Sequence, residues 1–392
     1  MSSDIEEAKQ AYLEYMEGSV AAFAPGRIEF LGNHLDYNGG LVLGAAIDAG
    51  IYALATPRKD TSVRLFSESF EDAVVETNLS DFSRLEGKKS WANYCLGVLK
   101  VMQDAEMAPL SGFSLTLTTN LPVSVGLSSS AALELATALV FSQLAGQELN
   151  RKDLVKFCRK AENEFVGMPC GILDQATSAF GKKDHLVLID CKTESVSSLP
   201  MPAESQLWIF DSGIKHDLID SHYATRNEEC QEALRLIRKL EPSLTCLAQA
   251  GEKLVEKANL PGQIRKRALH VVREQERVLS FQKGLSENAR LRDLGGLLTD
   301  SHHSSSELFE NSCPELDALV QSLVGHDQVL GARLTGGGFG GAVLAWTTTE
   351  FQQTDTDMIA NSYEKQFGHR PAAHCFSPSK GASIEDWKNA KG

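Results

Sequence analysis

The architecture of this chain can be worked out from one segment, Pro122-Val-Ser-Val-Gly-Leu-Ser-Ser-Ser-Ala-Ala132. Before it, Phe113, Leu115 and Leu117 alternate with polar residues, which is the period of a half-buried strand. After it, residues 131–144 are rich in Ala and Leu, as in a packed helix. The serines therefore fall at a helix start, where unpaired N–H groups and the positive dipole end favour phosphate.

A glycine- and serine-rich turn before a helix has three other interpretations. A Walker A loop needs a lysine, and none lies between Asn120 and Arg151. A hydrolase nucleophile elbow needs a second glycine two residues after the serine, where this chain has Ser130. An ordinary serine-rich helix cap remains as the simplest alternative.

Composition describes a globular protein of more than one domain. The chain has 392 residues, 42% hydrophobic and 23% charged, which predicts roughly two to three domains. Its net charge of −14 disfavours nonspecific binding to nucleic acid or to an anionic membrane. Any phosphate must therefore be held locally, by backbone amides, a few basic groups or a divalent cation.

The chain carries no signal for export or for membrane insertion. No run approaches the roughly 18 apolar residues of a spanning helix, and residues 1–7 are acidic and polar where a signal peptide is basic. We therefore expect a cytoplasmic protein. Its eight cysteines are scattered without a Cys-x-x-Cys pair, which predicts reduced thiols rather than disulfides or a zinc site.

Strand-like and helix-like segments alternate up to about residue 191, which indicates a mixed α/β chain. The expected strands include 41–47, 113–119 and 185–190, and the expected helices are 91–104, 131–145 and 151–166. After Leu199-Pro200-Met201-Pro202 comes another strand, 207–211, and then helical texture over about 225–323. We predict two domains, 1–200 and 201–392.

Two further segments hold polar residues at unusual density. Residues 24–40 pack Arg27, Asn33, His34, Asp36 and Asn38 between glycines. Asp and Asn side chains pair well with vicinal sugar hydroxyls, so a polyol site is plausible, while an Asx-rich surface turn is the plain alternative.

The segment 161–175 ends on Asp174, a lone carboxylate among apolar residues. Such a group is costly without a partner, and a nearby arginine is the natural one.

A third glycine-rich segment, Gly336-Gly-Gly-Phe-Gly-Gly341, formally satisfies G-x-G-x-x-G. A strand-like run follows it instead of a helix, so it does not fit a dinucleotide-binding fingerprint. A hairpin turn between two core strands is the structural interpretation, and five glycines around one Phe also suggest a close backbone approach.

With these segments together, the chain resembles the galactokinase family of the GHMP small-molecule kinases over nearly its whole length. Residues 26–40 are similar to Gly-Arg-x-Asn-Leu-x-Gly-Glu-His-Thr-Asp-Tyr-Asn-Gly-Gly, and residues 122–131 to Pro-x-x-x-Gly-Leu-Ser-Ser-Ser-Ala. Residues 335–341 match Thr-Gly-Gly-Gly-Phe-Gly-Gly, and 168–175 resemble the galactokinase-specific Met-Pro-Cys-Gly-Ile-Met-Asp-Gln. The resemblance implies an N-terminal domain like ribosomal protein S5 domain 2 and a ferredoxin-like C-terminal domain.

The resemblance also implies roles in a reaction of ATP, Mg²⁺ and a sugar. Asp174 matches the base that deprotonates the anomeric hydroxyl, and Arg27 matches the cation that stabilises charge on that oxygen and would keep Asp174 ionised. The phosphate loop corresponds to Ser124, Val125, Gly126, Leu127, Ser128, Ser129 and Ser130, and the Mg²⁺ ligands to Ser130 and Glu162. The sugar contacts correspond to Asn33, His34, Leu35, Asp36, Gly171 and Tyr223.

Two departures bear on the substrate, because Asn33 stands where the family has Glu and Leu35 where it has Thr. In the family that Glu accepts a hydrogen bond from the 6-hydroxyl, whereas an amide can also donate and does not repel an anion. Galactose, galacturonate and arabinose all remain candidates, with Asp36 favouring a galacto-configured sugar through C3 and C4. A sugar- and ATP-sensing regulator without turnover is the alternative of another class, and the oligomeric state stays open, a monomer being plausible.

Overall fold

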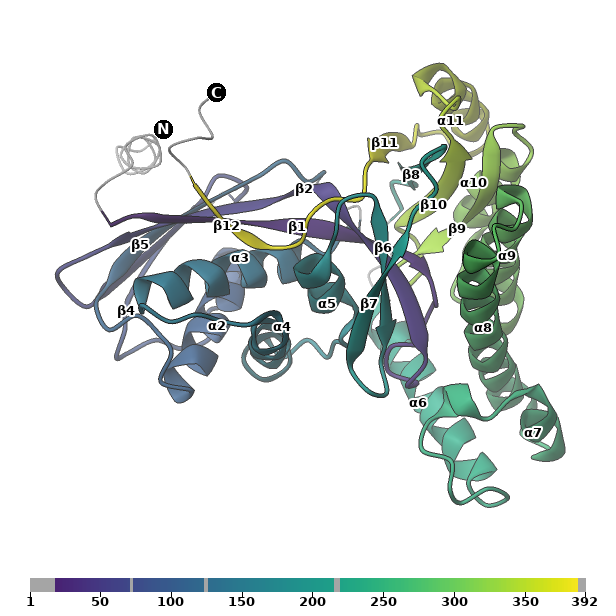
Figure 1. Cartoon of the computed structure of the whole chain (residues 1–392), viewed down its shortest axis with the longest axis horizontal. Coiled ribbons are helices and arrows are strands. Elements are labelled where there is room, and N and C mark those ends of the chain that lie inside the picture. Colours follow the sequence, from purple (N-terminus) through teal and green to yellow (C-terminus); the bar gives the residue numbers. More distant parts are fainter. Residues whose placement is uncertain (1–17, 71–72, 123–125, 215–218, 387–392) are drawn as a thin grey trace.

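A computed structural model of the chain describes residues 18–70, 73–122, 126–214 and 219–386. Two β-sheets organise these residues, and helices cover each of them (Figure 1). Among the described residues, no helix combines the length and the apolar character that crossing a bilayer requires. The expected mixed architecture with two halves is present.

The first sheet has eight strands in the order β12-β1-β2-β5-β3-β4, with β6 pairing with β2 and β7 with β6. Strand β2 is long enough to pair with β1, β5 and β6, and most of its residues are buried. The strands are β1 Val20–Leu31, β2 Leu41–Pro57, β3 Ser62–Ser67, β4 Val74–Asn78, β5 Phe113–Thr119, β6 His185–Asp190, β7 Ser195–Pro200 and β12 Ser383–Glu385.

The second sheet has four strands in the order β11-β8-β10-β9, and its described pairs are antiparallel. The strands are β8 Ser205–Asp211, β9 Val329–Thr335, β10 Ala342–Thr348 and β11 Ala372–Phe376. Strands β9 and β10 form a hairpin around Gly336–Gly341, which confirms the turn expected from the sequence. The glycines suit this turn because Gly336, Gly338, Gly340 and Gly341 all have positive φ.

Helices of the first half pack on one face of the first sheet (Figure 1). They are the 3₁₀ turn η1 Gly87–Ala92, α2 Asn93–Asp104, α3 Ser129–Leu144, α4 Arg151–Lys160, the π-helix η2 Ala161–Val166 and α5 Leu173–Phe180. Helix α3 is buried almost all round between the sheet and its neighbouring helices, as its Ala- and Leu-rich sequence predicts. The expected helix is therefore confirmed, and its buried residues begin at Ala131, just after the serine loop.

The long helical region after β8 is confirmed and is divided into several elements. They are α6 Ile219–Ile237, η3 Leu247–Gln249, α7 Glu252–Lys257, α8 Gly262–Ser286, α9 Leu291–Ser304, the π-helix η4 Ser305–Phe309 and α10 Pro314–Val324, and a separate helix, α11 Gln353–Phe367, follows β10. Proline at the start of α10 provides a fixed φ where no N–H partner is needed.

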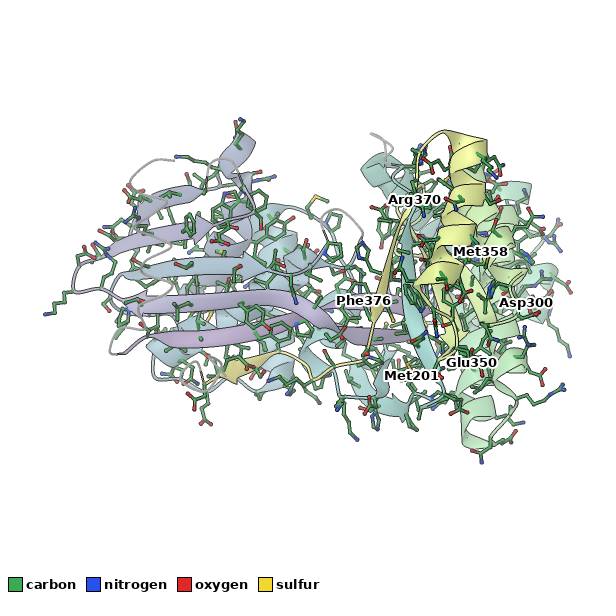
Figure 2. All side chains as sticks on the ribbon, turned by 90° about the horizontal axis from the view of Figure 1, so that it is seen from above. Met201, Asp300, Glu350, Met358, Arg370 and Phe376 are labelled. Atoms are coloured by element: carbon green, nitrogen blue, oxygen red, sulfur yellow. The ribbon has the colours of Figure 1, made fainter. Side chains whose placement is uncertain are left out.

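The two halves share a buried core. The Phe30 ring of β1 contacts Phe281 of α8 and Trp346 of β10, with ring centroids 5.1 Å and 5.6 Å away. After β11 the chain crosses back, and β12 pairs with β1 of the first sheet. Figure 2 shows Phe376 on the side of β11 nearer the first sheet, with Met358 and Asp300 farther away. The predicted boundary at residue 200 falls in the link between the sheets, but the last strand belongs to the first sheet.

Candidate active site

Arg27, Asp174 and all the predicted sugar-binding residues except Leu35 line a cavity of about 720 Å³, whereas the described loop residues 126–130 and Glu162 do not line it. Its walls come from the end of β1 and the loop after it, from residues 167–174, from α6 and from the β9–β10 turn. A larger hollow of about 920 Å³ lies between the end of β7 and the end of α8, and none of the predicted site residues lines it. The chemistry of the side chains therefore points to the smaller cavity.

Asp174 and Arg27 form an ion pair in the cavity wall, as the sequence predicts. Arg27 donates from Nε and Nη2 to Asp174 Oδ1, at 2.8 and 2.6 Å. Arg27 is 7% exposed, and it lies beside a register shift in the pairing of β1 with β2, an irregularity that redirects side chains near functional sites. Asp174 occupies the first turn of α5, where the helix dipole favours a carboxylate.

The serine loop is fastened to this ion pair by backbone contacts. Arg27 donates from Nη1 to the Gly126 carbonyl at 2.8 Å and from its own N–H to the Leu127 carbonyl at 3.0 Å. The approach is so close that a Cβ on Gly26 would lie 2.9 Å from the Leu127 carbonyl oxygen and 2.7 Å from Leu121. The first and second motifs are thus joined as the phosphate-loop hypothesis requires, while Ser124 and Val125 lie outside the described residues.

Ser128 does not act as the ordinary helix cap considered above. It has φ 53°, in the left-handed region, and its side chain makes no capping hydrogen bond to α3. Its hydroxyl instead donates to Asp174 Oδ2 at 2.6 Å. Both oxygens of Asp174 are therefore held, one by Arg27 and the other by the loop, while exposed Ser129 begins the helix.

Glu162 is buried and lies within hydrogen-bonding reach of Ser130, the last residue of the predicted loop. Glu162 belongs to the π-helix η2, an element often found at functional sites. Burial, followed by the charge of Asp174, raises its pKa, and hydrogen bonding to the Ser130 hydroxyl opposes the shift. Gln175 donates to Glu162 Oε2 at 2.6 Å and to Glu134 Oε2 at 3.1 Å, so an amide links two buried carboxylates.

Asp36 and Gly171 lie next to each other in the cavity wall. A Cβ on Gly171 would lie only 2.2 Å from Asp36 Oδ2, so glycine leaves the space that the carboxylate occupies. Burial, followed by the charge of Glu29, raises the pKa of Asp36 to about 7, and Asp174 adds to the shift. The Asp36 carboxyl is therefore divided between its two protonation states near neutral pH.

His34 and Tyr223 form an aromatic wall with Tyr37. The His34 ring lies 5.3 Å from the Tyr223 ring, and the Tyr37 hydroxyl is 2.9 Å from His34 Nδ1. Burial lowers the pKa of His34 to about 3, so the ring is neutral. Leu35 differs from its neighbours, because it is fully buried and does not line the cavity. Its backbone shapes the turn, with its carbonyl accepting from Asn38 and Gly40.

The chain is similar to known proteins over most of its length. Residues 93–182 match the model of the GHMP kinases N-terminal domain, 281–357 that of the GHMP kinases C-terminal, and 10–57 the galactokinase galactose-binding signature. The galactokinase of Pasteurella multocida is 35% identical over 363 residues, which are 92% of this chain and 94% of that one.

This chain belongs to the galactokinase family.

Other galactokinases support the same assignment. That of Thermotoga neapolitana is 38% identical over 346 residues, covering 88% of this chain and 94% of its own length. The crystal structure of Lactococcus lactis galactokinase, complexed with galactose, superposes with a TM-score of 0.90 at 29% identity, covering 97% of this chain and 100% of that one. The fold is thus the two-domain GHMP kinase fold, and the chain is a sugar-kinase-type phosphotransferase.

Some side chains that line the cavity of this galactokinase-family chain are not predicted from its sequence. They include Glu29, Tyr37, Met168, Asn227 and Glu228. Glu29 was detectable, because it falls inside the first motif at a position where the family motif has Asn. The α6 residues carry no comparable signal, since they reach the cavity only through the packing of that helix.

Proposed function

We propose that this chain transfers the terminal phosphoryl group of ATP to the anomeric hydroxyl of galactose, producing galactose 1-phosphate and ADP. The observation that carries the proposal is the contact of one carboxylate, Asp174, with both Arg27 and the serine loop at the cavity wall. Through these contacts a candidate base, a cation and a candidate phosphate-binding loop lie side by side, as phosphoryl transfer to a hydroxyl requires. The galactose in the Lactococcus lactis structure supports the choice of sugar.

Asp174 acts as the general base in this proposal. It takes the proton of the anomeric hydroxyl on Oδ2, and the hydroxyl oxygen bonds to the γ-phosphorus. The bond between that phosphorus and the β,γ-bridging oxygen breaks, and ADP leaves with the electron pair. Arg27, next to the base, stabilises the charge that develops on the transferring group, and positioning contributes most of the rate because phosphoryl transfer needs little covalent help.

The residues at the start of α3 suit the phosphates of ATP and Mg²⁺. The backbone of residues 124–130 would bind the phosphates at a helix N-terminus. Ser130 and Glu162 offer the hard oxygen ligands that Mg²⁺ prefers, and the buried Glu134 Oε1 has no hydrogen-bond partner in the described part of the chain. When bound, Mg²⁺ neutralises and orients the phosphates. No three acidic, His or Cys side chains among the described residues form a metal group, so phosphate oxygens would complete the coordination.

The sugar would lie against Asn33, His34, Asp36, Gly171 and Tyr223, with Leu35 contributing through the turn alone. The charged residues that line the described cavity are Arg27 and four acidic ones, and Arg27 is already paired. The acidic lining residues are Glu29, Asp36, Asp174 and Glu228. A uronate would meet these carboxylates without a spare cation, so the charges favour a neutral sugar over galacturonate.

The proposal is tested by ADP release from Mg-ATP and galactose, with Asp174→Asn as the diagnostic variant. We expect kcat to fall by roughly 10²- to 10⁴-fold, while galactose binding measured by calorimetry changes little. Near-normal turnover in the variant removes Asp174 from the mechanism. Galactose and ATP binding without ADP release by the unmodified protein would instead support the sensing regulator.

We also propose that residues 1–200 and 201–392 act as the two domains, with the last strand returning to the first. The reaction consumes ATP, so the proposed location is the cytoplasm.

A further inference from the structure

Asn33 has no hydrogen-bonding capacity left for a ligand. Its Nδ2 donates to Glu29 Oε1 at 3.1 Å and to the Gly336 carbonyl at 2.9 Å. Its Oδ1 accepts from Ser305 at 3.2 Å and from Asn311 at 3.0 Å. An amide has two N–H groups and two lone pairs, so all four are used inside the protein, and Asn33 is 1% exposed. A sugar hydroxyl could bind this amide only by displacing a protein group.

Glu29, four residues earlier on β1, has the capacity that Asn33 lacks. Its Oε1 accepts from Asn33 and from Arg333 Nη2 at 3.0 Å, in an ion pair whose side chains are 5% and 0% exposed. Its Oε2 accepts no hydrogen bond from any residue in the described part of the chain, and Glu29 lines the cavity. One oxygen therefore anchors the carboxylate while the other remains available in the cavity wall.

The first motif of the family has Asn at the position of Glu29 and Glu at the position of Asn33. This chain carries the same two residue types in reversed order, and the two side chains touch. The reversal preserves a contacting carboxylate and amide at one end of the cavity. Asn33 considered alone would suggest that the carboxylate of the family motif is missing, whereas the reversal places that carboxylate at Glu29.

We propose that Glu29 is the specificity-determining residue that accepts the hydrogen bond of the sugar's 6-hydroxyl through Oε2, and that Asn33 is a positioning residue that holds Glu29. This inference rests on the proposed function, since it concerns recognition of that sugar. It predicts selection for a neutral sugar with a hydroxyl at C6, because a carboxylate there would face the Glu29 carboxylate. A 6-deoxy sugar would leave Oε2 desolvated and unpaired.

The test compares galactose with 6-deoxygalactose, both as substrates and as ligands titrated by calorimetry. We expect the unmodified protein to prefer galactose at least about 100-fold in kcat/KM, and Glu29→Asn to prefer it less than about tenfold. The double variant Glu29→Asn/Asn33→Glu, which restores the family order, should return to within about threefold of the original preference. Glu228→Gln, an exposed carboxylate of the same cavity, is the matched control and should keep the original preference.

A Glu29→Asn variant that keeps the original preference overturns the proposal, as does a double variant no more selective than the single one. Thermal unfolding checks that each variant is folded, and if Glu29→Asn is not, Glu29→Asp, which keeps the charge beside Arg333 but is one methylene shorter, decides by the same criterion. Failure of the proposed function is distinguishable, because it appears as no ADP release by the unmodified protein. The ratio of the two sugar dissociation constants still tests Glu29 in that case, since binding requires no turnover.

Discussion

Sugar binding should depend on pH through Asp36. Its pKa is raised from 3.8 to about 7, first by burial and then by the charge of Glu29, with a further contribution from Asp174. The proposed role of Asp36 is to accept hydrogen bonds from two sugar hydroxyls, which favours its ionised form. Galactose should therefore bind more weakly as the pH falls through 7.

The size of the effect follows from the fraction of Asp36 that is ionised before the sugar binds. With a pKa of about 7, roughly 9% is ionised at pH 6 and roughly 91% at pH 8. The dissociation constant for galactose should then rise about tenfold from pH 8 to pH 6, or about 1.4 kcal/mol. The raised pKa of Asp36 also makes the free energy of unfolding depend on pH. The protonated Asp36 carboxyl contributes its whole stabilisation below pH 3.8, and this contribution is lost as the pH rises through about 7.

Isothermal titration with galactose at pH 6, 7 and 8, without nucleotide and at constant ionic strength, measures this dependence. Asp36→Asn is the control and should bind more weakly but without the change between pH 6 and 8. His34 does not titrate in this window, because burial lowers its pKa to about 3. Dissociation constants that agree within twofold from pH 6 to 8, or a dependence that persists in Asp36→Asn, would refute the reasoning.

Ser128→Gly removes the hydroxyl that holds the proposed base, and glycine tolerates the left-handed backbone at this position. We expect kcat to fall roughly 10- to 100-fold, while ATP binding measured by calorimetry changes little. An unchanged kcat would show that the hydroxyl does not position the base. Gly171→Ala puts a Cβ 2.2 Å from Asp36 Oδ2 and should raise the KM for galactose at least about tenfold, so an unaltered KM in steady-state assays would contradict the predicted crowding. Glu274→Gln leaves the Arg277 guanidinium without its buried partner and should lower the free energy of unfolding in urea by about 3 kcal/mol; a loss under about 1 kcal/mol counts against this ion pair.

Local patterns were sufficient for the elements that carry the site. Helix α3 and strand β5 could be predicted because periodicity and side-chain composition are properties of neighbouring residues. The β9–β10 hairpin could be predicted for a similar reason, since runs of glycine permit the positive φ angles that a tight turn demands. The pairing of Asp174 with an arginine was predictable from the cost of an unpaired buried carboxylate, and Arg27 from the first motif.

Contacts between distant segments were not accessible in this way. The Ser128 hydroxyl could have capped its own helix, and only the packing of α5 against α3 puts Asp174 within its reach. The return of β12 to the first sheet depends on how the whole second half docks, so a boundary drawn from composition could not include it.

The amino-acid sequence alone determined the family, and it was sufficient for the hypotheses of a phosphate loop and of a base with its cation, because these depend on residue types in short, ordered motifs. The tertiary structure decided which polar groups remain available to a ligand. Asn33 and Glu29 are equivalent candidates for a sugar contact when only the sequence is known. In the folded chain the Asn33 amide makes four hydrogen bonds to protein groups, whereas one oxygen of Glu29, in the cavity wall, remains available to a ligand. The partners that occupy the Asn33 amide come from β1, the β9–β10 turn and the region after α9. These segments are far apart in the sequence, so which donors and acceptors are already occupied is decided only when the chain folds.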